Sequence, residues 1–145
     1  MGTLYQNKTL FEILLRVGRE NQLPVLLPKD LLASASDLSS ILNQNDIVID
    51  RMITIGPNVP ADGWSKFYSD AIKSLQPGVT ELIVHIAYDD EEMRGATADH
   101  PDWGAAWRQR DLQFFTSDTF RTLLKENHIR LVTWREIGRA RYKER

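Results

Sequence analysis

Residues 78–90 read Gly78-Val79-Thr80-Glu81-Leu82-Ile83-Val84-His85-Ile86-Ala87-Tyr88-Asp89-Asp90. Apolar side chains follow one another almost without a break over 81–87, which is typical of a parallel strand that is covered on both faces. α/β proteins build their sites where such strands end, because the loops there converge on one crevice. The histidine, the tyrosine and the carboxylates at the end of this stretch are therefore candidate functional residues.

The composition of the 145-residue chain is that of an ordinary globular domain, with 42% hydrophobic and 26% charged residues. The net charge of −2 gives no electrostatic footprint for nucleic acid or an anionic membrane. No apolar run approaches the ~20 residues that span a bilayer. The absence of cysteine excludes disulfides, thiolate nucleophiles and cysteine zinc sites. We predict a cytoplasmic protein without nucleic-acid or membrane partners.

Hydrophobic spacing and breaker residues divide the rest of the chain into alternating elements. Helices are expected at about 7–20, 37–42, 62–75, 89–93, 102–115 and 117–126, and the residues from 135 onward are expected to form a charged helix or a frayed tail. Strands are expected at 24–28, at 47–49 with an extension to 55, at 81–87 and at 129–134. This alternation predicts an α/β fold with a mainly parallel sheet of about four strands, in a single segment over 1–145. A closed eight-stranded barrel takes ~250 residues, so we expect a small open sheet or part of something larger. The chain also opens on a helix with no strand before it, which hints at truncation.

Three stretches carry a resemblance to a known family. They are Leu75-Gln76-Pro77-Gly78-Val79-Thr80-Glu81-Leu82-Ile83-Val84-His85, Trp107-Arg108-Gln109-Arg110-Asp111-Leu112 and Ile129-Arg130-Leu131-Val132-Thr133-Trp134-Arg135-Glu136. In this order they resemble the C-terminal part of the YdjC-like carbohydrate deacetylases. The segment Met1-Gly2-Thr3-Leu4 resembles an internal position of longer family members, so we expect the chain to correspond to their C-terminal half.

The resemblance implies a distorted, partial (β/α) barrel and a metal-dependent hydrolysis of the N-acetyl group of an amino sugar. In the complete family member a divalent metal, Mg or Zn, is held by an aspartate and histidines of the N-terminal half and activates water. The histidines of this chain are His85, His100 and His128, and no two are close enough in sequence to suggest a ligand pair. We therefore expect no metal on this chain alone, and an isolated chain without activity.

Four residues are candidates for the site. His85 lies at the motif position suited to a general acid that protonates the departing amine. The alternative for His85 is a strand-end histidine that bonds to a neighbouring loop. Tyr88 lies beside it and is expected to line the sugar site. Arg108 and Asp111, three residues apart on one helix, either pair along its surface or reach the mouth of the site and bind substrate.

The acidic run Asp89, Asp90, Glu91 and Glu92 has two interpretations. It resembles a metal cluster, but carboxylates in a first helical turn also satisfy free N–H groups and the helix dipole, which is the favoured interpretation. One alternative for the whole chain is an acid-cluster hydrolase that uses Asp89 and Asp90, and the favoured alternative is a self-contained α/β module that binds a ligand or partner without catalysis. Unpaired strand edges recruit other chains, so a homo-oligomer is expected in addition to the amino-sugar substrate.

Overall fold

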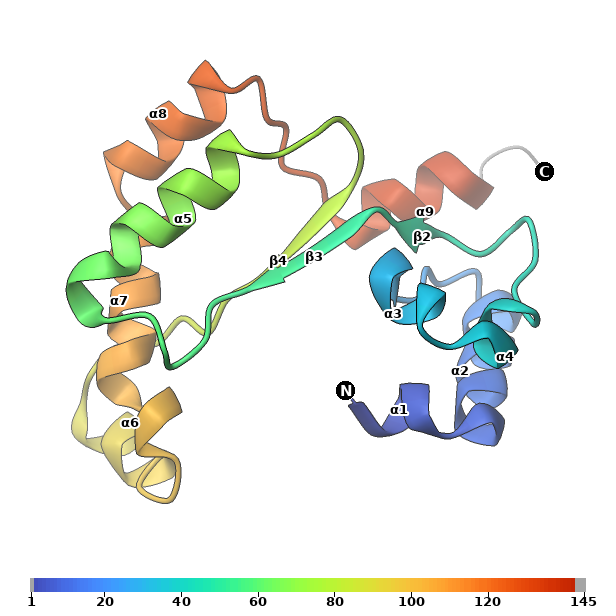
Figure 1. The fold of residues 1–145 in the computed structure, drawn as a ribbon, viewed down its shortest axis with the longest axis horizontal. Helices are drawn as coiled ribbons and strands as arrows, with labels where there is room; N and C mark the ends of the chain where they lie inside the picture. Colours follow the sequence, from blue (N-terminus) through green and yellow to red (C-terminus); the bar gives the residue numbers. More distant parts are fainter. Residues whose placement is uncertain (1, 143–145) are drawn as a thin grey trace. The chain divides into compact units, whose positions relative to one another are not determined.

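The computed structural model describes residues 2–142, whose elements are drawn in Figure 1. Contacts between residues divide the chain into two compact units. The first unit comprises residues 1–52, 78–81 and 131–145, and the second comprises residues 53–77 and 82–130.

The first unit is mainly helical, with one short pair of strands. Its elements are α1 (Gly2–Gln6), α2 (Lys8–Glu20), β1 (Leu27–Pro28), α3 (Lys29–Ala33), α4 (Ser36–Ser39), β2 (Val48–Ile49) and α9 (Trp134–Tyr142). Strands β1 and β2 are parallel, with Leu27 opposite Val48 and Pro28 opposite Ile49. The predicted helix over 7–20 is confirmed as α2.

Helix α2 forms because its start is capped and one of its faces is apolar. The side chain of Asn7 accepts a hydrogen bond from the backbone N–H of Leu10 at 3.1 Å, which satisfies a donor of the first turn. Phe11, Leu15 and Gly18 form the buried face of the helix. The core cluster of this unit consists of Phe11, Leu15, Leu27, Leu32 and Leu38. Each buried Leu or Phe side chain contributes about 1.5–3 kcal/mol.

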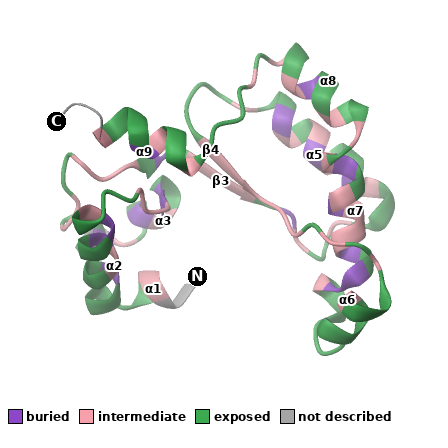
Figure 2. Cartoon of the chain, turned by 180° about the vertical axis from the view of Figure 1, so that it is seen from behind, coloured by how far each residue is buried: buried purple, intermediate pink, exposed green. Residues whose placement is uncertain are grey.

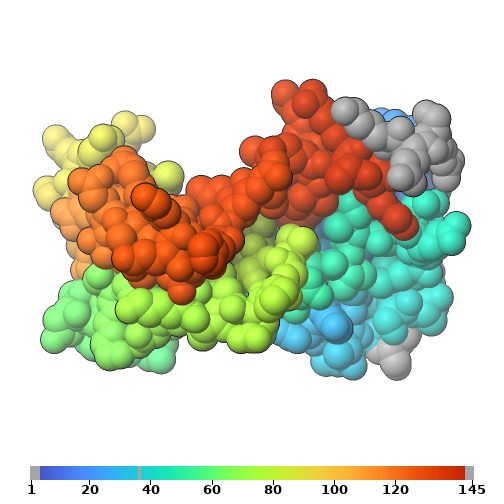
Figure 3. Space-filling model, turned by 90° about the horizontal axis from the view of Figure 1, so that it is seen from above, coloured from blue at the N-terminus to red at the C-terminus, as the bar shows by residue number. Residues whose placement is uncertain are grey.

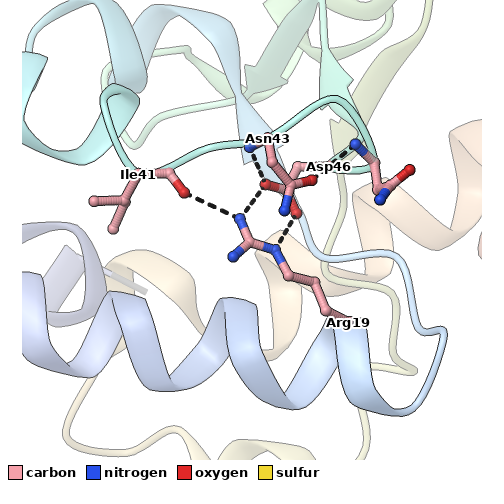
Figure 4. Close-up of polar contacts among 5 residues, drawn as sticks. Arg19, Ile41, Asn43 and Asp46 are labelled. Carbon is pink, nitrogen blue, oxygen red and sulfur yellow. Dashed lines mark hydrogen bonds and ion pairs between the residues drawn. The ribbon is translucent and has the colours of Figure 1, made fainter.

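A polar contact connects the end of α2 to the loop before β2 (Figure 4). Arg19 Nε donates to Asp46 Oδ1 at 2.9 Å, and Arg19 Nη2 bonds to Asp46 Oδ2 and to the carbonyl oxygen of Ile41. Asp46 Oδ2 also accepts from the backbone N–H of Asn43 at 2.8 Å. The Asp46 side chain is only 6% exposed, so the two hydrogen bonds from Arg19 compensate for the cost of removing this carboxylate from water. The hydrogen bond that Arg19 donates to Asp46 is the main cause that raises the pKa of Arg19.

Replacing Arg19 by glutamine is expected to lower the free energy of unfolding by about 1.5–3 kcal/mol, because Asp46 then lacks its charged partner. Urea unfolding measures this change. Arg16→Gln is the matched control, since Arg16 is an exposed arginine on the same helix, and it should shift stability by no more than ~0.5 kcal/mol. Equal effects of the two variants would contradict the role given to the Arg19–Asp46 pair.

The second unit holds most of the later helices. They are η1 (Ala61–Gly63), α5 (Trp64–Lys73), α6 (Glu91–Ala96), η2 (Pro101–Trp103), α7 (Ala105–Phe115) and α8 (Asp118–Glu126). Strands β3 (Arg51–Thr54) and β4 (Thr80–Ile83) form a two-stranded sheet, and the division between the units falls within these two strands. Helix α8 packs against α5 and α7, and the surfaces of α5 and α8 lie side by side in Figure 3.

The core of the second unit is strongly aromatic. Figure 2 shows buried residues along α5 and α7. The buried cluster consists of Ile55, Trp64, Tyr68, Ile72, Trp107, Phe114 and Leu123. Tyr68 is completely buried, and its ring centroid lies 5.2 Å from that of Phe114 and 4.7 Å from that of Phe115. Such aromatic pairs contribute about 0.5–1.5 kcal/mol beyond their burial.

The turn that leads into β4 requires a glycine. Gly78 has φ +136°, a conformation that residues with a side chain rarely adopt. A Cβ at this position would lie 2.5 Å from Asp50 Oδ2, which accepts a hydrogen bond from the backbone N–H of Val79 at 2.9 Å. The backbone N–H of Asp50 in turn donates to the carbonyl oxygen of Val79 at 3.0 Å. The Asp50 side chain thus occupies the space beside Gly78.

The predicted α/β class is confirmed, and three details differ. The strands form two separate pairs within residues 2–142, and the predicted strand over 47–55 is divided at Asp50 into β2 and β3. The predicted strand over 81–87 ends at Ile83. The strand predicted over 129–134 is wrong, because Thr133 and Glu136 bond reciprocally and begin helix α9 at Trp134. The barrel-like arrangement stays a prediction.

Among the helices of residues 2–142, none combines the length and hydrophobicity that crossing a bilayer requires.

Candidate functional site

The carboxylate of Asp111 is the centre of the polar contacts in the second unit. Asp111 has 0% of its surface exposed. Its Oδ1 accepts hydrogen bonds from Trp64 Nε1 at 2.9 Å and from the Tyr68 hydroxyl at 2.8 Å. Its Oδ2 accepts from the backbone N–H of His85 at 2.8 Å. Three donors from α5 and from the segment after β4 therefore converge on one buried side chain of α7.

Helical spacing explains why these groups meet. Trp107, Asp111 and Phe114 recur at i, i+4 and i+7, so they lie on one face of α7, and all three are buried. Trp64 and Tyr68 are four residues apart on the buried face of α5. Burial raises the pKa of the Tyr68 hydroxyl far above its ordinary value, and the hydrogen bond to Asp111 raises it further. The hydroxyl therefore stays protonated and continues to donate to Asp111.

His85 lies two residues beyond the end of β4 and is held through its backbone. Its imidazole lies against Trp103, with ring centroids 5.6 Å apart and planes at 62°. The ring nitrogen Nδ1 is buried and has no hydrogen-bond partner among the described residues. The backbone bond to Asp111 fixes the position of the residue without using either ring nitrogen.

The loop after His85 is attached to α7 at two further points. The backbone N–H of Ala87 donates to the carbonyl oxygen of Arg108 at 3.4 Å. The backbone N–H of Asp89 donates to Gln109 Oε1 at 2.9 Å. With the bond from His85, three main-chain donors of this loop therefore bind acceptors on α7. These bonds fix the backbone of the loop, so the positions from which its side chains extend are defined.

A row of aromatic rings extends from His85 into the core. The centroids of Trp103 and Trp107 are 4.3 Å apart, and those of Trp107 and Trp64 are 4.6 Å apart. The guanidinium carbon of Arg110 lies 4.6 Å from the Trp64 ring centroid, which is a cation–π distance. Trp107 Nε1 and Arg110 Nε are buried without a partner among the described residues, as is His85 Nδ1. Orphaned buried donors are uncommon and often mark functional sites.

The four predicted site residues occupy different environments. His85 and Asp111 meet directly. Arg108 is partly buried, and its Nε donates to the carbonyl oxygen of Trp103 at 3.1 Å. The surface pair between Arg108 and Asp111 is not formed, because Asp111 is buried and bonds to other donors. Tyr88 is 70% exposed. The roles of all four residues stay predictions.

The acidic run after the site forms a helix start. Asp90 caps α6 by accepting from the backbone N–H of Met93 at 2.8 Å, and Asp89 Oδ1 pairs with Arg94 Nε at 2.7 Å. The capping interpretation is therefore confirmed. In residues 2–142 no three His, Asp or Glu side chains converge into a group that holds a metal ion. The described residues thus do not fit the divalent metal that the family chemistry implies.

Sequence reasoning missed the partners that position His85. Trp64 and Tyr68 fall within the helix predicted over 62–75, but neither of them was connected to His85, and neither Trp103 nor Gln109 was connected to the loop after β4. A signal was available, because Asp111 occupies an apolar-face position between Trp107 and Phe114. A carboxylate on such a face has to be buried and hydrogen-bonded. The donors themselves come from distant sequence and are visible only in the fold.

A pocket of about 540 Å³ lies in the first unit and contains none of the predicted site residues. Its lining consists of Gln22, Leu23, Pro24, Trp134, Arg135, Gly138, Arg139 and Tyr142. These residues come from the turn after α2 and from α9. Trp134 and Arg135 belong to the stretch 129–136 that was quoted for the family resemblance, but no ligand role was predicted for them.

Comparison with known proteins gives the family and a similar fold. A proposed cellobiose-phosphate cleavage protein from Enterococcus faecalis V583 has a similar structure, with a TM-score of 0.55 and 18% sequence identity. The similarity covers 92% of this chain and 49% of that protein, so the chain spans about half the length of this relative. No curated protein sequence matches the chain. The YdjC-like protein family matches residues 1–126. The chain therefore belongs to the YdjC-like protein family.

Proposed function

We propose that this chain is part of a carbohydrate-processing hydrolase that removes the N-acetyl group from an amino sugar, with His85 as general acid. The observation that supports this proposal best is the state of the His85 imidazole. Its backbone is fixed by the buried Asp111, while the ring makes no hydrogen bond to the described residues. A histidine with an uncommitted ring on a fixed backbone is suited to proton transfer near neutral pH.

In this proposal the proton leaves from Nε2 of His85, since Nδ1 is buried. When the amide C–N bond of the substrate breaks, the departing nitrogen accepts this proton and leaves as a neutral amine. Trp103, which lies against the imidazole, limits the orientations of the ring. Asp111 acts as a positioning residue, because it bonds to the backbone of His85 and is too buried to contact a sugar.

Tyr88 and Arg108 are the proposed substrate contacts. Tyr88 is exposed on the loop that α7 holds, so its ring is available to stack on a sugar face. Arg108 is partly buried, and its guanidinium bonds to the main-chain carbonyl oxygen of Trp103, the residue whose ring contacts His85. Both side chains are therefore anchored to the same loop and helix as the proton donor.

For the complete protein we also propose a distorted (β/α) barrel that binds a divalent metal, Mg or Zn, as the family resemblance implies. When bound, such a metal activates the attacking water. The described residues do not fit the metal, so its ligands are assigned to sequence other than residues 2–142. A second candidate is a ligand-binding module without catalysis, and the pocket beside α9 is the observation that favours it.

The test is an assay of acetate release from N-acetylglucosamine oligomers in the presence of Mg²⁺ or Zn²⁺. We compare the isolated chain with the same chain joined to the metal-binding half of a longer family member. The joined protein is expected to release acetate, and the isolated chain is expected to release none. A folded joined protein that binds the metal and releases no acetate would contradict the hydrolase proposal and favour the binding module.

A further inference from the structure

The pocket beside α9 is a groove between this helix and the turn after α2. A Cβ at Gly138 would lie 3.1 Å from Pro24 Cδ, so the absence of a side chain lets the helix approach the turn. Leu23, which is 57% exposed, and Trp134 supply further apolar lining. The groove therefore offers an apolar wall that is open to another molecule.

Two arginines give this groove a positive charge. Arg135 and Arg139 are exposed and four residues apart, so they lie on one face of α9. The ion pairs within residues 2–142 include neither guanidinium. Glu136 of the same helix lies outside the lining, and its carboxylate accepts hydrogen bonds from the backbone N–H and the hydroxyl of Thr133. The groove thus favours a partner that carries carboxylates.

The chain itself carries an acidic surface of matching sign around α6. Residues 89–102 contain six acidic side chains and one arginine. That arginine, Arg94, pairs with Asp89, and Asp90 caps the helix. Glu91 and Glu92 are exposed, and the ion pairs within residues 2–142 include neither of them. Two carboxylates at the start of α6 are therefore available to a partner.

The side chains that follow these two carboxylates on α6 are small. Gly95 and Ala96 are exposed, and a Cβ at Gly95 would meet no other atom within 4 Å. Glu92 and Ala96 are four residues apart, so they share a face of the helix. An edge of this kind lets the helix approach an apolar wall closely while its carboxylates reach the arginines beside that wall.

We infer that the groove beside α9 of one copy of the chain binds the start of α6 of a second copy. Glu91 and Glu92 pair with Arg135 and Arg139, since carboxylates and guanidinium groups form two-point hydrogen bonds. The whole chain has a net charge of only −2, so the attraction comes from the separation of the two charged surfaces. The inference is independent of the proposed hydrolase function.

The first test is sedimentation equilibrium of the chain at concentrations up to about 1 mM, because small contacts associate weakly. Raising the salt from about 0.01 M to about 1 M shortens the Debye length from about 30 Å to about 3 Å and should weaken self-association tenfold or more. Arg139→Glu should weaken it about as much at low salt, because like charges then face each other. Arg141→Glu is the matched control, since Arg141 is an exposed arginine of α9 outside the groove, and it should have a much smaller effect.

The second test locates the contact and leaves every charge in place. The chain has no cysteine, so single-cysteine variants report which surfaces meet. Leu23→Cys in the groove, mixed with Ala96→Cys on α6, should form a disulfide-linked dimer under mild oxidation. Ala33→Cys replaces Leu23→Cys in the control, because Ala33 is exposed in the same unit outside the groove, and it should cross-link to Ala96→Cys far more slowly.

Four results would overturn the inference. They are a chain that stays monomeric at low salt, self-association that salt does not weaken, equal effects of Arg139→Glu and Arg141→Glu, and cross-linking of Leu23→Cys no faster than that of Ala33→Cys. Circular dichroism shows that each variant is folded. Neither test measures an activity, so failure of this contact is distinguishable from failure of the proposed hydrolase function.

Discussion

Replacement of Asp111 by alanine is expected to lower the free energy of unfolding by about 3–5 kcal/mol. The substitution removes the acceptor of Trp64 Nε1, the Tyr68 hydroxyl and the backbone N–H of His85, all of which are within 2.9 Å of the carboxylate. Because Asp111 is completely buried, water does not replace these bonds without a cavity opening. Urea unfolding followed by tryptophan fluorescence measures the loss, since three tryptophans belong to this unit.

Asp111→Asn removes the negative charge of the side chain but keeps its shape, whereas alanine removes both. If the remaining carbonyl oxygen faces Trp64 and Tyr68, the new amide group faces the backbone N–H of His85, and two donors meet. If the amide is reversed, it faces the indole N–H of Trp64, which cannot accept. Either orientation breaks one bond, so we expect a loss smaller than that of the alanine variant, about 1–3 kcal/mol.

The matched control is Gln113→Ala, which changes an exposed residue of the same helix and should shift stability by no more than ~0.5 kcal/mol. Tyr68→Phe removes one donor, keeps the ring and should cost about 1 kcal/mol. An alanine variant at Asp111 as stable as the Gln113 variant would show that the three hydrogen bonds contribute nothing to folding.

The helices were predictable from sequence because their signals are local. Asn7 before α2, Asp90 before α6 and Ser117 before α8 each accept a bond from a backbone N–H three residues on. The strands were less predictable, because pairing depends on distant partners. Ile129–Trp134 has the composition of a strand, yet Leu131 and Val132 are exposed, and the reciprocal bonds of Thr133 and Glu136 begin a helix there.

The candidate site was predictable only in part. The position of His85 after an apolar strand follows from the sequence, and its connection to Asp111 does not. The carboxylate was expected either to pair along the helix surface or to reach the mouth of the site, whereas the fold buries it among donors from a helix that precedes it by more than forty residues. Contacts of this kind depend on how α5 and α7 pack, and no local pattern encodes that packing.

The second large effect is expected at His85 and concerns activity rather than stability. In the joined protein that carries the metal-binding half, His85→Ala is expected to lower kcat by about 10²–10⁴-fold, which is the usual contribution of a general acid. The fold should survive, because the bond to Asp111 comes from the backbone N–H, which alanine retains. The loss of the ring against Trp103 should cost no more than about 1.5 kcal/mol.

His100→Ala is the matched control, since His100 is an exposed histidine of the same unit, and it should leave kcat unchanged. Asp111→Asn tests the coupling between the two residues. If Asp111 positions the proton donor, this variant should lower kcat with little change in KM, because it displaces the backbone of His85 without touching the sugar. An unchanged kcat in His85→Ala would assign the proton donor to another residue. An unchanged kcat in Asp111→Asn alone would leave His85 as the acid and limit Asp111 to stabilising the core.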